Sequence, residues 1–523
     1  MELVKGRDPY LQELLWFAVC CRVLTLLLQA SALFNLLIPD HAADAFSPPR
    51  LAEPGFCDLL LEGLLGGLSR WDAEHFLFIA ERGYVYEHNF AFFPVFPLSV
   101  RAVAEVALWP LQWLLRLRSR LLLSAALLNS LFSVLAAAAL YKLGCAVLQC
   151  RRMAFLGALL FCISPASVFM AAAYSESMFA FLVFSAMWHL EKGQSWHSGL
   201  LFSLASGVRA NGLVNAGFFA YSRSKRFALQ LQVGPGLVSK LPPFWRRLLS
   251  LASSVIFMCA GIFLPFVVFQ YYAHMMFCGP GTGLSQSIPK PLLQLALDKD
   301  YRLAAADRFK PPWCSQRFPV LYSYIQEAYW NVGFLRYFEL RQIPNFLLAL
   351  PVTLLGLGAA WTYLTANPRH CLTLGLERRS YEEEQGEDKT GTGFCCPAVL
   401  VYVVHATVLL LFGVFCMHVQ VLTRFLGSST PILYWFSAHL LQEHEPLLWS
   451  EGTDKETRAS PSGKSVLGDC LAGSSEKGIS ENPVVRLLRN YRLNTPMTKC
   501  ILGYFLSYWL LGLILHCNFL PWT

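Results

Sequence analysis

The chain has 523 residues, of which 55% are hydrophobic and only 15% are charged. Soluble globular chains carry about 25% charged residues, so this composition excludes an ordinary soluble domain and indicates a polytopic membrane protein. The net charge of +8 is not a nucleic-acid signal, because the basic residues stand in short clusters between apolar runs, as the positive-inside rule produces. We expect one all-α integral membrane domain over residues 1–523.

The first apolar run, residues 11–38, is predicted to be a span retained as a signal anchor, since it lacks a small-residue cleavage site. Residues 39–92 hold nine acidic and three basic residues, and their short apolar pieces predict amphipathic helices at the membrane interface. Residues 90–115 are predicted to cross next. They end in the basic cluster Arg116–Arg120, which we expect in the cytosol, so that loop 39–92 faces the lumen.

The apolar runs predict about eleven crossings, within a range of 8–13. Residues 274–342 are expected to form a second large lumenal loop, and 366–396 and 442–498 flexible cytosolic loops. Two spans are short, and tilted, broken or re-entrant arrangements of them stay open. The further predicted spans are 119–141, 153–172, 176–190, 198–221, 249–273, 343–365, 397–418, 421–441 and 499–520.

Most of the sixteen cysteines lie inside apolar runs, where they behave as small buried hydrophobes. No Cys-x-x-Cys pair or Cys/His ligand spacing is present, so we expect no metal site. Cys278 and Cys314 share the second predicted lumenal loop, where an oxidising compartment allows them to pair; two free thiols are the alternative.

The stretch Ser69–Phe76 is the strongest candidate for chemistry. It places Asp72, Glu74 and His75 directly after Trp71. Partial desolvation at the membrane surface would raise the pKa of Asp72 and make it a base for a hydroxyl proton, with Glu74 and His75 orienting substrate or stabilising charge. The alternative is a solvated loop acid in a capping box, in which Ser69 caps a helix and Asp72 stands three residues on.

Glu176 follows Tyr174 and Ser175 between two apolar runs. An ionisable residue in that position marks a functional site or a polar cavity, although stabilisation by the helix dipole is an equal alternative. The count of spans places this turn on the cytosolic side, away from Asp72, unless the short spans are re-entrant.

Two arginines are candidate phosphate ligands. Arg209 and Asn211 lie inside a predicted span, where an arginine pairs or meets an anion, or else snorkels to the interface. Arg424 lies in a hairpin expected to face the lumen, and an ordinary interface anchor is its alternative.

The second predicted lumenal loop is rich in aromatic residues, which suit an interface belt, with stacking on a sugar as the less favoured reading. These residues are Trp313, Tyr322, Tyr324, Tyr329, Trp330 and Tyr337.

Several segments together resemble the class V phosphatidylinositol-glycan (PIG-V) family, GPI mannosyltransferases of the GT-C class of multi-span glycosyltransferases. They are Arg70–Phe76, Asn89–Pro94, Ser164–Pro165, Tyr174–Glu176, Gly207–Gly212, Tyr329–Phe334 and Cys517–Thr523.

The resemblance implies an enzyme of the endoplasmic reticulum membrane with a lumenal active site. It would transfer the second mannose, in α1,6 linkage, from dolichyl-phosphate mannose to a mannosyl-glucosaminyl-phosphatidylinositol. The donor is β-linked and the product α, so the reaction would invert and need one base, which the resemblance assigns to Asp72. Arg209 or Arg424 would stabilise the departing phosphate, and no cofactor is expected. The other expected substrate-binding residues are Trp71, Glu74, His75, Tyr174, Glu176 and Asn211.

Other functions stay open on the residues alone. A lipid transporter or scramblase would need a polar path at mid-membrane depth, for which only Glu176, Arg209 and Asn211 are available. A different dolichol-dependent glycosyltransferase, or a non-catalytic subunit that docks a partner through its acidic loop, would fit the same pattern. Whether the chain requires a small accessory membrane subunit also stays open.

Overall fold

The computed structural model describes residues 8–34, 46–232, 244–279, 288–303, 311–317, 319–376, 392–448, 481–520 and 522. Within these ranges the regular elements are helices, and strand pairing is limited to one isolated bridge between Tyr86 and Leu303. The all-α prediction is therefore confirmed for the described part of the chain.

Six of the described helices are long and apolar enough to cross a membrane. Each coincides with a predicted span, although residues 35–38 of the first span lie outside the described ranges. On the longest helix, Phe257, Leu264 and Val268 are more than half exposed, as expected of side chains that face lipid. The six helices are α1 (Pro9–Phe34), α5 (Leu117–Val147), α11 (Phe244–Cys278), α14 (Ile343–Ala366), α17 (Leu400–Cys416) and α21 (Pro496–Cys517).

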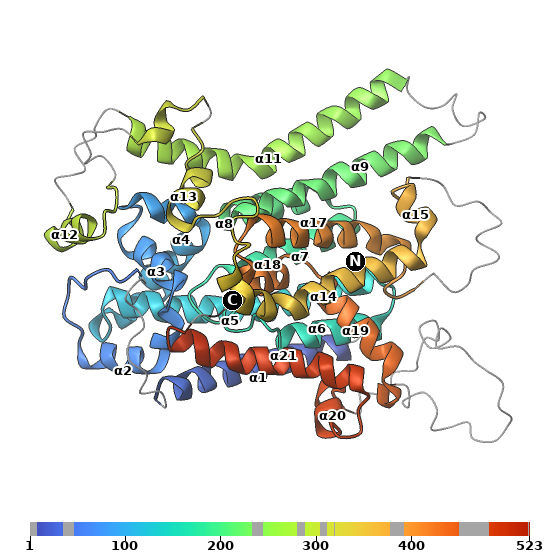
Figure 1. Ribbon diagram of the computed structural model, residues 1–523, viewed down its shortest axis with the longest axis horizontal. Helices are drawn as coiled ribbons and strands as arrows, with labels where there is room; N and C mark the ends of the chain where they lie inside the picture. The colour runs from blue at the N-terminus through green and yellow to red at the C-terminus, as the bar shows by residue number, and fades with distance from the viewer. Residues whose placement is uncertain are drawn as a thin grey trace.

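Shorter helices fill the space around α5. The helices α6 (Arg151–Cys162) and α7 (Glu176–Glu191) pack along it, and α8 (Ser195–Val208) packs between α7 and α11. In Figure 1, α9 (Ala216–Leu231) lies beside the first half of α11. Most of the buried side chains belong to one cluster that extends through α5, α6 and α7.

The single span predicted over 198–221 is wrong, because the chain turns back after α8. Phe202 on α8 contacts Phe218 and Phe219 at the start of α9, and α8 packs on the 3-10 turn Ala210–Asn215 that joins the two helices. Gly212 lies in the turn between them, and a Cβ on it would stand 2.6 Å from backbone atoms of Ser206. Only glycine fits such a close approach.

The crossing predicted over 90–115 is also wrong. This segment consists of α4 (Val95–Ala102), a π turn and a 3-10 turn (Trp109–Trp113), none long enough to span a bilayer. Its composition is apolar, but Pro94 directly precedes α4 and Pro110 lies in the 3-10 turn, and a proline cannot donate the backbone hydrogen bond that a continuous helix needs at those positions.

Without that crossing, the basic cluster Arg116–Arg120 lies on the same side as the acidic loop. Arg118 forms an ion pair with Glu74, and the backbone N–H of Arg116 donates to Asp58 at 2.9 Å. The expectation that the cluster and the loop face opposite sides is therefore wrong.

The segment 274–342, predicted as the second large lumenal loop, folds against the loop 39–92. Its helix α13 (Leu321–Trp330) packs on the segment 87–91, and its 3-10 turn Pro312–Ser315 is tied to the end of α11 by a disulfide between Cys278 and Cys314. The pairing of these two cysteines is confirmed. In Figure 1 this module, with α12 (Lys290–Asp298), lies beyond α3 and α4 at one end of the molecule.

A buried carboxylate joins the two loops. Glu87 is fully buried and accepts hydrogen bonds from Trp313 Nε1 at 2.8 Å and from the Tyr329 hydroxyl at 2.9 Å. We expect Glu87→Ala to cost about 2–4 kcal/mol of stability, because the buried Trp313 N–H and the partly buried Tyr329 hydroxyl lose their acceptor. The measurement is the thermal unfolding of the detergent-solubilised chain. Glu327→Ala is the control, since Glu327 forms only an exposed pair with Arg336; equal losses for the two variants would contradict the interpretation.

The loops predicted at 366–396 and 442–498 are described only at their edges, since 377–391 and 449–480 lie outside the described residues. The edges hold two short helices, α15 (Pro368–Leu372) and α20 (Pro483–Arg489). The predicted span 421–441 is interrupted at Thr430 and Pro431, which separate α18 (Leu422–Ser429) from α19 (Ile432–His444).

Candidate active site

Asp72 is the first residue of α3 (Asp72–Arg82), and the residue before it has an unusual backbone. Trp71 has φ 56° and ψ −130°, a conformation that costs a non-glycine residue about 1–3 kcal/mol. Its ring contacts Phe519 near the end of the chain, 5.9 Å between centroids. The hydroxyl of Ser69 donates to the carbonyl of Gly66 instead of capping α3, so the predicted capping box is wrong.

Four charged side chains meet next to this helix start. Arg424 Nη2 on α18 lies 3.0 Å from Asp72 Oδ2, and Arg424 Nη1 lies 3.8 Å from Glu176 Oε1. Arg209, which follows α8, contacts the same Glu176 oxygen at 2.5 Å. Two carboxylates and two guanidinium groups thus alternate in a chain that begins at Asp72, and they come from four separate segments.

Tyr174 and Phe169 hold the central arginine. The Arg424 guanidinium lies 5.3 Å from the Tyr174 ring centroid and 5.0 Å from that of Phe169, within the range of cation–π attraction. The Tyr174 hydroxyl also accepts a hydrogen bond from the backbone N–H of Asp72 at 3.2 Å. Tyr174 therefore contacts both members of the Asp72–Arg424 pair.

The turn that carries Glu176 lies on the same side as Asp72, so the prediction that the two face opposite sides is wrong. The reason is that the helix before this turn is shorter than the predicted span. Helix α6 has only 12 residues, and the chain then forms an irregular segment over 163–175 before α7. Asn129 of α5 fixes this segment by donating to the carbonyl of Tyr174 at 2.9 Å and accepting from Ser177 at 2.5 Å.

Asp72 is ionised in this arrangement. Burial alone raises the pKa of Asp72, but the positive charge and hydrogen bond of Arg424 outweigh it, so the pKa lies below its ordinary value. The raised pKa expected from desolvation is therefore wrong for the protein without substrate. The Asp72 side chain keeps 33% of its surface exposed, whereas Glu176 has none exposed. Asp72 is the carboxylate of the cluster that a substrate can reach.

The remaining predicted residues lie around this cluster without joining it. Glu74 pairs with Arg118, and burial raises the pKa of Glu74 despite that partner. Asn211 donates to the Ser429 hydroxyl at 2.9 Å. The His75 ring is stacked between aromatic rings.

Sequence reasoning missed several buried polar residues that support the site. Arg22 on α1 donates to Ser167 Oγ at 2.5 Å and to the Cys162 carbonyl at 3.0 Å, which anchors the segment before Glu176. His516 on α21 contacts the Tyr174 and Phe169 rings edge-on. Both stand in long apolar runs, and an ionisable residue inside a predicted span was the available signal.

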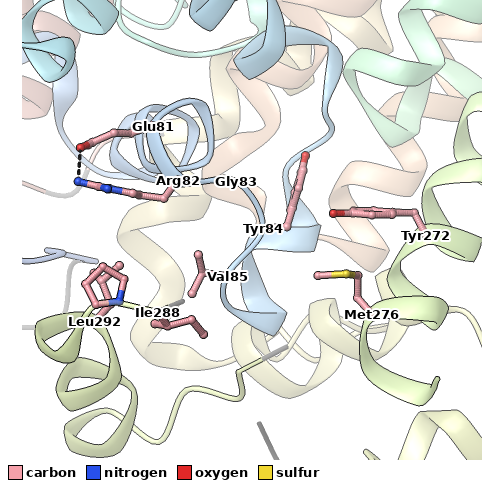
Figure 2. A pocket seen from close by; sticks show the side chains of 10 residues that line it. Glu81, Arg82, Gly83, Tyr84, Val85, Tyr272, Met276, Ile288 and Leu292 are labelled. Atoms are coloured by element: carbon pink, nitrogen blue, oxygen red, sulfur yellow. Dashed lines mark ion pairs between the residues drawn. The ribbon is translucent and has the colours of Figure 1, made fainter. Parts of the chain in front are cut away.

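A pocket of about 400 Å³ lies away from the charged cluster. Figure 2 shows it between the end of α3, the turn at Tyr84, and Tyr272 and Met276 of α11, with an ion pair of Glu81 and Arg82 on one wall. None of the four clustered charges lines it. The candidate active site is therefore the charged cluster of Asp72, Glu176, Arg209 and Arg424.

Comparison with known proteins agrees with the resemblance. The family model described as Mannosyltransferase (PIG-V) matches residues 11–523. The chain is 58% identical to GPI alpha-1,6-mannosyltransferase 2 of Cricetulus griseus and 56% identical to that of Homo sapiens, each over 99% of both chains. It is 33% identical to GPI mannosyltransferase 2 of Drosophila pseudoobscura pseudoobscura, over 80% of this chain and 89% of that protein. No solved structure matches. This chain belongs to the PIG-V family of mannosyltransferases.

Proposed function

We propose that this chain transfers the second mannose of the GPI anchor, in α1,6 linkage, from dolichyl-phosphate mannose to a mannosyl-glucosaminyl-phosphatidylinositol. The names of its relatives support the reaction. The observation that carries the mechanism is the pairing of a reachable carboxylate, Asp72, with Arg424 beside it. An inverting transfer needs one base and a cationic site for the leaving phosphate, and this pair supplies both.

In the proposed step, Asp72 takes the proton of the acceptor hydroxyl as that oxygen forms a bond to the anomeric carbon. The bond from this carbon to the phosphate oxygen breaks, and dolichyl phosphate leaves with the electron pair and one additional negative charge. Arg424 and Arg209 stabilise that charge, as positioned cations do in a low-dielectric site. The charges of the two arginines, Asp72 and Glu176 cancel before the donor binds.

The same geometry couples donor binding to the strength of the base. A phosphate that draws Arg424 away from Asp72 removes the charge that lowers the carboxylate pKa. Burial then raises the pKa, and Asp72 becomes a stronger base when the donor is in place. In the free enzyme we therefore expect Asp72 to be a weak base, because it is paired with Arg424.

We propose that the Asp72 side faces the lumen of the endoplasmic reticulum. The Cys278–Cys314 disulfide supports this orientation, because it lies in the module that contacts the Asp72 loop through Glu87, and disulfides persist in oxidising compartments. We further propose that α6, α7, α8, α9 and the α18–α19 pair cross the membrane with the six long helices, which gives about eleven crossings.

The test is complementation of cells that lack this activity. The full chain should restore GPI-anchored proteins at the surface and remove the accumulated lipid with one mannose. The purified chain should form the two-mannose lipid from dolichyl-phosphate mannose, with a linkage that an α1,6-specific mannosidase cleaves. Normal expression without restoration, or another linkage, would overturn the proposal.

A further inference from the structure

Three polar side chains next to Asp72 are buried and carry atoms without a well-formed hydrogen bond. His75 is 9% exposed, His88 3% and Asn89 0%. These atoms are His75 Nδ1, His88 Nδ1 and Nε2, and Asn89 Nδ2 and Oδ1; the Asn89 amide has only a weak interaction with the His75 ring. The large majority of buried side-chain polar atoms in native proteins have a partner, so such a concentration at one place calls for a ligand that supplies the missing hydrogen bonds.

Aromatic rings enclose these atoms. The Phe46 ring is stacked on His75 at 4.3 Å and lies 5.3 Å from His88. Tyr301 lies 4.3 Å from His88, and Trp330 of α13 lies 6.4 Å from His75. Flat rings combined with a few convergent polar atoms suit a ligand with apolar ring faces and hydroxyl edges, as in a hexose.

The two histidines are neutral at physiological pH. Burial lowers the pKa of His75 to about 4, despite Asp72 and Asn89, and lowers the pKa of His88 well below its ordinary value. A neutral imidazole has one donor and one acceptor nitrogen, and the Asn89 amide also has both kinds of group. Hydroxyl groups, which donate and accept, are the chemical match.

The position relative to Asp72 indicates which sugar fits. His75 lies one turn along α3 from Asp72, whereas Arg424 and Arg209 converge on Glu176. In an inverting displacement the attacking oxygen and the leaving phosphate stand on opposite sides of the anomeric carbon. If the arginines hold the phosphate, the sugar on the histidine side of the base is the acceptor.

We propose that His75, His88 and Asn89 form a hexose-binding site for the mannose of the acceptor, in the place that the Phe46 ring takes in the free protein. This inference rests on the proposed function and adds two residues, His88 and Asn89, that determine acceptor recognition. It also gives the aromatic residues Tyr329 and Trp330 of the second loop a place beside a sugar.

His88→Phe is the sharpest test, because it keeps a ring against Tyr86 and removes only the two nitrogens. Since these nitrogens have no partner in the free protein, thermal stability should not fall. The KM for a synthetic mannosyl-glucosaminyl-phosphatidylinositol should rise roughly tenfold, with the donor KM unchanged. His405→Phe, at another buried histidine with an unpartnered Nδ1, is the matched control and should leave both KM values unchanged.

A second experiment uses synthetic acceptors in which the mannose lacks one hydroxyl group, chosen among those that do not attack the donor. At least one of them should be poorer than the parent for the wild-type chain but equal to it for His88→Phe or Asn89→Ala. Unchanged acceptor KM and unchanged discrimination would overturn the inference, and a rise in the donor KM alone would overturn its assignment to the acceptor. A wild-type chain that makes no two-mannose product would instead overturn the proposed function.

Discussion

Asp72→Asn is expected to lower kcat by about 10³-fold, the usual loss when a positioned general base is removed. Asparagine is close in shape and keeps an oxygen for the Arg424 hydrogen bond of 3.0 Å, but it cannot take a proton. Binding of both lipid substrates should therefore change little compared with turnover. The measurement is the rate of two-mannose lipid formation by the purified chain at saturating donor and acceptor.

Asp58→Asn is the matched control. Asp58 belongs to the same acidic loop but accepts backbone hydrogen bonds from Gly55 and Arg116 at 2.9 Å, which is a structural role. We expect this variant to lose stability. Its kcat per folded molecule should stay within a few-fold of the wild-type value. If Asp72→Asn, expressed at the normal level, keeps more than a tenth of the wild-type kcat, Asp72 is not the base.

The long helices could be predicted because an uninterrupted apolar run of about 20 residues has few alternatives in a membrane protein. The prediction of a crossing over 90–115 failed because it used the same criterion, the length of an apolar run. Hydropathy counts apolar side chains but not backbone hydrogen bonds, and Pro94 and Pro110 prevent one continuous helix over this segment. The Arg116–Arg120 cluster then gave a wrong prediction of the topology. Its charges form contacts within the protein, such as the ion pair of Arg118 with Glu74, and do not mark the cytosolic side.

The candidate site was predictable as a set of residues but not as an arrangement. Asp72, Glu176, Arg209 and Arg424 each stood out as ionisable groups in or near apolar segments. Their pairing could not be inferred from the sequence, since Asp72 and Arg424 are 352 positions apart and Glu176 was placed on the wrong side. The contact depends on α6 ending after 12 residues, a local break that apolar composition does not reveal. His88 and Asn89 gave no such signal, because they lie in a loop where polar residues are ordinary.

Arg424→Gln is expected to lower kcat/KM by about 10²–10³-fold, the loss typical of one electrostatic contact to a developing charge. It should also change the pH dependence. In the free enzyme Arg424 holds the pKa of Asp72 below its ordinary value against the opposing effect of burial. Without the arginine, burial dominates, the pKa rises, and the carboxylate is protonated at a higher pH. The acid limb of kcat/KM, which reports the free enzyme, should therefore move upward by about 1–3 pH units.

Two further arginine variants separate this effect from a general loss of charge. Arg209→Gln removes a cation that contacts Glu176 but not Asp72, so it should weaken donor binding with a smaller shift of the acid limb. Arg118→Gln removes the partner of Glu74 and should leave the limb in place. An acid limb at the wild-type pH in Arg424→Gln would contradict the coupling, whatever the loss of rate. A shift of the acid limb in Arg424→Gln alone would mean that the residue that stabilises the phosphate also sets the pKa of Asp72. Asp72 would then become an effective base only after the donor has bound.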